Sequence, residues 1–147
     1  MTQTLPMPDE NALAASRALV ARICEEARRE GDFLTFERFM ELALYAPGLG
    51  YYAGGSRKFG AGGDFVTAPE VSPLFSRCLA VQVAEVLARL GGGVVLEFGA
   101  GSGVMAAEVL IELAARNALP EKWLILEVSG ELRERQASLL SETTPQH

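Results

Sequence analysis

The chain of 147 residues has almost no histidine and little cysteine. Its single histidine is the last residue, His147, so no histidine-based catalytic or metal site is expected within the chain. The two cysteines, Cys24 and Cys78, lie far apart in segments with helical patterns. They suggest neither a disulfide framework nor a zinc site, which is consistent with a reducing compartment.

Long apolar runs and an excess of positive charge are also missing. No apolar stretch approaches the ~20 residues that span a bilayer. The net charge of -6 argues against a nucleic-acid-binding surface, which needs clustered lysine and arginine. The N-terminus lacks the pattern of a signal peptide, and Glu25, Glu26 and Glu30 count against a mitochondrial transit peptide. We therefore expect a cytoplasmic protein that binds neither nucleic acid nor membrane.

Apolar spacing predicts helices first and then alternating strands and helices. The expected helices cover 10–30, 35–46, 73–90, 103–116 and 129–140, and the expected strands cover 94–98 and 123–128. The helix at 73–90 should bury Phe75, Leu79, Val83, Val86 and Leu90. The apolar run at 123–128 is typical of a strand covered on both faces. The order from residue 94 onward predicts a parallel α/β sheet.

A glycine-rich segment, residues 46–72, separates the first helices from this alternation. Its aromatic residues, Tyr51, Tyr52, Phe59 and Phe65, are more than a flexible linker usually carries. Long loops within compact domains are often functional. We therefore predict a folded binding loop or a small hairpin rather than a linker.

The stretch V-V-L-E-F-G-A-G-S-G, residues 94–103, is the main chemical motif. A dinucleotide fold needs a third small residue where this chain has Val104, and a phosphate-binding P-loop needs a lysine after the glycines, which is absent. Glu97 would repel a pyrophosphate but suits a cationic ligand such as S-adenosylmethionine (SAM). The helix N-terminus behind the glycines offers N–H groups to the methionine carboxylate. The motif therefore favours SAM.

Glu127, at the end of the second expected strand, adds a possible ribose ligand. An acid at this position accepts hydrogen bonds from ribose hydroxyls in dinucleotide folds as well. Glu127 alone therefore does not choose between cofactors, and each glutamate could also be a solvated strand end.

Four segments resemble the MidA-like class I methyltransferases. They are F39-M-E-L-A-L-Y-A-P-G-L-G-Y-Y52, F59-G-A-G-G-D-F-V-T-A-P-E-V-S-P-L-F75, L96-E-F-G-A-G-S-G103 and L126-E-V-S-G-E-L-R-E-R-Q136. The resemblance implies a Rossmann-like sheet that binds SAM, and a mitochondrial member that assembles complex I and methylates a protein arginine. Ala100, Ser102, Val104 and Gly130 depart from the residues that the family usually carries there.

The resemblance also implies that residues 59–70 fold over the cofactor, with Asp64, Phe65, Thr67 and Glu70 facing or bracing the pocket. The predicted cofactor-binding residues are Glu97, Gly99, Ala100, Gly101, Ser102, Gly103, Glu127, Val128, Asp64, Phe65 and Thr67. No catalytic residue and no metal ligand is assigned. The expected division is a helical region with the covering loop, 1–72, and the first portion of the SAM-binding domain, 73–147.

Only two strands of the family's larger sheet are found, so the chain is expected to be the N-terminal part of a longer protein. Its exposed strand edge should self-associate or pair with a missing half. The predicted function is SAM-dependent methyl transfer to a protein side chain, arginine by resemblance, with the chain alone inactive. The alternative is a non-catalytic, methyltransferase-like adaptor that binds a partner such as a respiratory-complex subunit.

Overall fold

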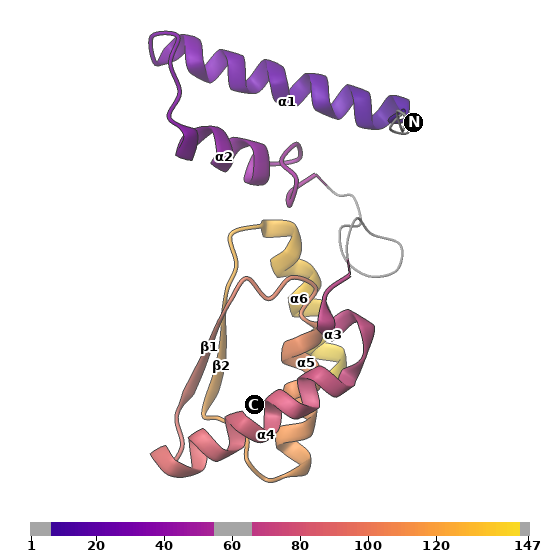
Figure 1. The fold of residues 1–147 in the computed structure, drawn as a ribbon, viewed down its shortest axis with the longest axis vertical. Helices are drawn as coiled ribbons and strands as arrows, with labels where there is room; N and C mark the ends of the chain where they lie inside the picture. The colour runs from indigo at the N-terminus through magenta and orange to yellow at the C-terminus, as the bar shows by residue number, and fades with distance from the viewer. Residues whose placement is uncertain (1–6, 55–65, 145–147) are drawn as a thin grey trace, which may run out of the picture. The chain divides into compact units, whose positions relative to one another are not determined.

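The computed structural model describes residues 7–54 and 66–144, and the chain divides into two compact units, 1–55 and 56–147. The first unit contains α1 (Glu10–Arg29) and α2 (Phe36–Tyr45). The second contains α3 (Ala68–Val71), α4 (Pro73–Leu90), β1 (Val94–Phe98), α5 (Val104–Ala115), β2 (Lys122–Leu126) and α6 (Gly130–Thr143) (Figure 1). The domain division expected after residue 72 stays a prediction.

In the first unit, two capped helices are joined by an ion pair. The Thr35 side chain accepts a hydrogen bond from the Arg38 N–H, which confirms Thr35 as the cap of α2. Arg38 of α2 also donates to Glu26 of α1 from Nε, at 2.9 Å, and from Nη2, at 2.6 Å. These hydrogen bonds lower the pKa of the Glu26 carboxyl. The pair therefore fixes α2 against α1.

The core of the second unit lies between α4 and α5, where Ala80, Val109 and Leu113 are fully buried. The stripe expected on α4 is partly wrong. Leu79 and Val83 pack against this core, but Phe75, Val86 and Leu90 are exposed. The buried residues of α4 are Ser76, Ala80 and Leu87. Short side chains on this face let α5 approach closely, which a search for large apolar residues does not detect.

The two strands are parallel, with Val94 opposite Lys122 and Phe98 opposite Leu126. Figure 1 shows α4, α5 and α6 on one side of them. Trp123 is partly buried against the core on that side. The other face exposes Val94, Leu96, Phe98, Leu124 and Leu126. The expectation that the second strand is covered on both faces is therefore wrong for the described residues.

The strand–helix alternation predicted from residue 94 onward is confirmed, with small differences at the ends. The first strand has the predicted limits, whereas β2 is Lys122–Leu126 rather than 123–128, and α6 continues to Thr143. Gly103 is the N-cap of α5 rather than its first residue. Because β2 ends at Leu126, Glu127 and Val128 lie in the loop that follows it.

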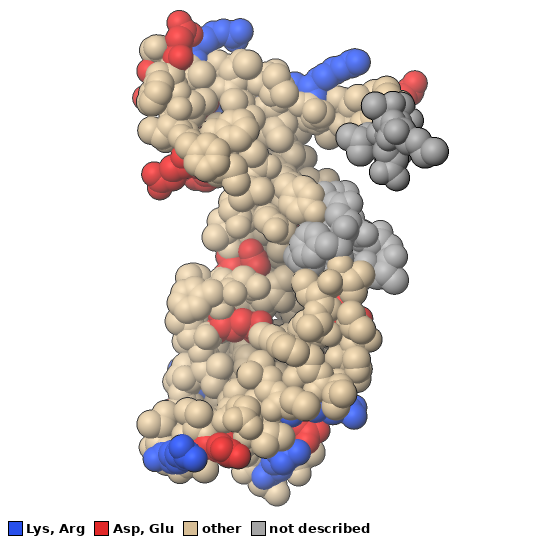
Figure 2. Space-filling model, in the orientation of Figure 1, with Lys and Arg blue, Asp and Glu red and all other residues tan. Residues whose placement is uncertain are grey.

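Most of the surface visible in Figure 2 carries neither acidic nor basic side chains. No helix among the described residues is long and apolar enough to span a bilayer. Within the same residues, His, Cys, Asp and Glu form no group of three that could hold a metal ion. Of the glycine-rich segment, residues 55–65 lie outside the described ranges, so the predicted loop or hairpin stays a prediction.

Candidate cofactor site

A turn of three glycines carries the chain from β1 into α5. Gly99, Gly101 and Gly103 have φ angles of +66°, +56° and +84°, all left-handed. Residues with a Cβ are disfavoured there by about 1–2 kcal/mol. The Gly99 N–H donates to the Leu126 carbonyl at 2.9 Å, so the turn begins beside the end of β2. The turn therefore lies at the carboxyl edge of the two strands.

The turn is open at one glycine and closely packed at another. A Cβ at Gly99 would meet no atom within 4 Å. A Cβ at Gly103 would lie 3.3 Å from both Cα and Cγ of Gln136 in α6. Gly99 thus leaves space for a ligand, whereas Gly103 allows α6 to approach the start of α5.

Glu127 lies next to this turn with both carboxylate oxygens hydrogen-bonded. Its Oε1 accepts from the Ser129 N–H at 2.9 Å, and its Oε2 accepts from Gln136 Nε2 at 3.2 Å. Ser129 also caps α6 through its hydroxyl, which accepts from the Leu132 N–H. The neighbouring Val128 is 65% exposed. The loop after β2 therefore presents a held carboxylate next to an exposed apolar side chain.

Glu97 contacts a tryptophan at the sheet. The Trp123 indole N–H donates to Glu97 Oε2 at 3.0 Å. Burial raises the pKa of the Glu97 carboxyl, and this hydrogen bond opposes the rise. Apolar spacing assigns Trp123 only to a strand, although the alternate-residue period of β2 puts it on the same face as Ile125. The structure therefore adds Trp123 to the surroundings of the predicted site.

The short helix α3 is joined to the glycine turn by one hydrogen bond. The Ser102 hydroxyl donates to the Glu70 carboxylate of α3. Thr67 is the N-cap residue of α3 and is exposed. Asp64 and Phe65 lie outside the described residues. The structure therefore brings Glu70 to the turn, while the predicted roles of Asp64 and Phe65 stay predictions.

Gln136 is the polar residue of the site to which the sequence assigned no role. It is 3% exposed, and its Nε2 donates to the Gly101 carbonyl at 2.9 Å as well as to Glu127. A sequence signal exists, because Gln136 follows Leu132 by one helical turn and so shares its buried face. A glutamine in a buried helical stripe needs hydrogen-bond partners.

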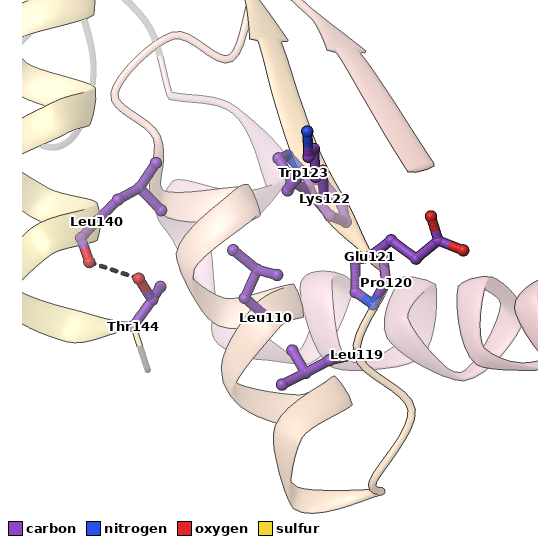
Figure 3. A pocket seen from close by; sticks show the side chains of 8 residues that line it. All are labelled: Leu110, Leu119, Pro120, Glu121, Lys122, Trp123, Leu140 and Thr144. Carbon is purple, nitrogen blue, oxygen red and sulfur yellow. Dashed lines mark hydrogen bonds between the residues drawn. The ribbon is translucent and has the colours of Figure 1, made fainter. Parts of the chain in front are cut away.

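A separate cavity of about 180 Å³ lies elsewhere in the second unit. Figure 3 shows it between α5, the end of α6 and the start of β2, with Leu110, Trp123, Leu140 and Thr144 among its lining residues. It adjoins Lys122 at the amino end of β2, whereas the glycine turn lies at the carboxyl edge. Ligand pockets are usually about 300–1,000 Å³. We therefore keep the glycine turn, rather than this cavity, as the candidate cofactor site.

A parallel β–α–β unit with a glycine turn and an acid after the second strand is the arrangement that Rossmann-like folds use to bind nucleotide cofactors. Residues 78–147 match the family model described as "Putative S-adenosyl-L-methionine-dependent methyltransferase". This match and the relatives described next confirm the resemblance to the MidA-like methyltransferases that the sequence indicates.

Solved structures and curated relatives agree with this assignment. A methyltransferase candidate from Burkholderia thailandensis, crystallised with S-adenosyl-homocysteine (SAH), is 48% identical, with a TM-score of 0.84 over 97% of this chain and 38% of its own. The mitochondrial protein arginine methyltransferase NDUFAF7 of Danio rerio is 32% identical over 74% of this chain and 27% of its own length. The NDUFAF7 homolog of Caenorhabditis elegans is 33% identical over 73% of this chain and 26% of its own.

The curated relatives bear on the expected location of the protein and on how much of a relative this chain spans. The expected cytoplasmic location is wrong, because the curated relatives are mitochondrial proteins. The acidic residues Glu25, Glu26 and Glu30 are therefore no guide to location. The chain spans about a quarter of the length of the curated relatives that it matches.

Proposed function

We propose that this chain supplies the SAM-binding part of a methyltransferase that acts on a protein side chain. The observation that carries the proposal is the Glu127 carboxylate, which is held by Ser129 and Gln136 beside a left-handed glycine turn. Both features lie at the carboxyl edge of parallel strands, where α/β folds bind their ligands.

The residues of the site suit SAM better than a dinucleotide. Glu97 and Glu127 put negative charge at the edge of the sheet, and Val104 stands where a dinucleotide-binding turn has its third small residue. SAM carries an ammonium and a sulfonium but no phosphate. The open space at Gly99 leaves room for a ligand against the backbone. These carboxylate acceptors therefore fit a cationic nucleoside.

Each predicted cofactor residue has a role in this proposal. Glu127 accepts hydrogen bonds from the ribose hydroxyls, and Val128 covers an apolar part of the nucleoside. The glycine turn of Gly99, Ala100, Gly101, Ser102 and Gly103 lets the ligand approach the backbone, and the start of α5 faces its carboxylate. Glu97 attracts the ammonium, and Thr67, with Asp64 and Phe65, belongs to the covering segment.

SAM supplies an activated methyl group, and the protein's main contribution is to orient the two reactants. A protein arginine is the proposed acceptor, because the curated relatives carry the name protein arginine methyltransferase. The adaptor alternative is not favoured, because the family model and the SAH-bound neighbour both point to an enzyme.

Calorimetry on the protein expressed from its complete reading frame tests the proposal. We expect micromolar binding of SAM and SAH, no comparable binding of NAD, and a loss of at least tenfold in Glu127→Ala. Glu121→Ala is the matched control, because Glu121 is an exposed acid at the other end of β2. Absence of SAM and SAH binding in the unsubstituted protein would overturn the proposal.

A further inference from the structure

Gln136 joins three parts of the candidate site through one buried amide. It lies on α6, donates to the Gly101 carbonyl in the glycine turn, and donates to Glu127 after β2. An amide nitrogen has two N–H groups, so these contacts match its donor capacity. Gln136 therefore fixes the distance between the glycine turn and the acid.

The hydrogen bonds also set the orientation of the Glu127 carboxylate. Gln136 holds Oε2 at 3.2 Å, and the Ser129 N–H holds Oε1 at 2.9 Å. An ionised carboxylate has about four lone-pair sites. Both oxygens therefore keep capacity to accept a further hydrogen bond, which is what a pair of ribose hydroxyls requires.

Gln136 itself is poorly placed to contact a ligand. The residue is 3% exposed, and a Cβ added at Gly103 would lie only 3.3 Å from its Cα and Cγ. Any effect of Gln136 on ligand affinity must therefore pass through the groups that it bonds.

We propose that Gln136 is a positioning residue that holds the Glu127 carboxylate for the ribose diol of the cofactor. This inference rests on the proposed function, because it requires that Glu127 bind the ribose. A residue that only stabilises α6 would change the affinity for all ligands of the site equally. The role proposed for Gln136 instead changes only the affinity for ligands that carry the ribose diol.

The test compares two ligands and two variants of the complete protein by calorimetry. Gln136→Met keeps the side-chain length and removes the donors, and Gln82→Met, at an exposed position of α4, is the control. The ligands are SAH and its 2′,3′-dideoxyribose analogue. We expect Gln136→Met to bind SAH about tenfold more weakly, and to bind the dideoxy analogue as the unsubstituted protein does.

A second comparison removes the mediating group. In a Glu127→Ala background, Gln136→Met should cause no further loss of SAH affinity, because the interaction through which it acts is gone. If Gln136→Met shows no cooperative melting transition, Gln136→Glu replaces it in the same titrations. Its carboxylate lacks the amide donors and repels Glu127, so the same loss specific to SAH is expected.

Two results would overturn the inference. One is an equal loss of affinity for SAH and for the dideoxy analogue, and the other is unchanged SAH binding in the variant. If the unsubstituted protein itself fails to bind SAH, the proposed function fails, and this inference fails with it.

Discussion

Gly103 and Gly91 have nearly the same backbone conformation but different surroundings. Their φ angles are +84° and +78°. A Cβ at Gly91 would meet nothing within 4 Å, whereas one at Gly103 would press against Gln136. The pair therefore separates the cost of a left-handed conformation from the cost of close packing.

We expect Gly103→Ala to be clearly more destabilising than Gly91→Ala. Gly91→Ala, the control, should lower the free energy of unfolding by about 1 kcal/mol from backbone strain alone. Gly103→Ala adds overpacking against α6, for a total of about 2–4 kcal/mol. Chemical denaturation of both variants measures the difference. Equal losses would show that α6 does not approach the glycine turn as closely as described.

The buried position of Glu97 predicts a dependence of stability on pH. Because burial raises its pKa in the folded state above the usual 4.5, the folded protein binds more protons than the unfolded chain just above that pH. This contribution is present at lower pH and is lost as the pH rises through the raised pKa. Glu97→Gln should therefore raise the free energy of unfolding at neutral pH and flatten its pH dependence.

Denaturation curves of the parent protein and Glu97→Gln between pH 4.5 and neutrality test this expectation. Trp123 is the single tryptophan of the chain and contacts Glu97, so its fluorescence reports the same titration locally. An unchanged pH slope in the variant would contradict the account.

The same substitution, Glu97→Gln, should weaken SAM binding, because it removes negative charge from the proposed site.

At the scale of elements, the sequence predicted the strands and helices well but not all of their contacts. The order β1, α5, β2, α6 follows from apolar spacing and glycine punctuation, which are local signals. The buried face of α4 was missed because its contact residues include the small Ser76 and Ala80. The role of Gln136 depends on tertiary contacts with Gly101 and Glu127, which local spacing does not encode.

The hydrogen bond between Ser102 and Glu70 predicts an energetic coupling between α3 and the glycine turn. We expect a double-mutant cycle of Ser102→Ala and Glu70→Gln to give a coupling of about 1 kcal/mol in stability. The exposed pair Ser138 and Glu142, both on α6, is the control and should couple less. A coupling of zero at Ser102 and Glu70 would mean that α3 does not brace the turn.

At the scale of the whole molecule, one face of the strand pair is apolar and exposed. Leu96 and Phe98 of β1 and Leu124 and Leu126 of β2 contribute to it. Among the described residues, β1 pairs only with β2, so its other edge is unpaired. Exposed strand edges of this kind promote association between chains.

The 147-residue chain expressed by itself should therefore self-associate or precipitate. Sedimentation velocity over a range of concentrations measures this tendency. Leu96→Lys together with Leu124→Lys should reduce self-association, while Gln82→Lys, at an exposed position of α4, serves as the control. A monodisperse monomer at high concentration would contradict the expectation.

A structure of the complete protein with bound SAH tests the central claim most directly. The account predicts that the ribose hydroxyls lie within hydrogen-bonding distance of Glu127, and that the amino-acid part lies over the Gly99–Gly103 turn. SAH bound away from Glu127 and the glycine turn, or no binding at saturating concentration, would contradict it.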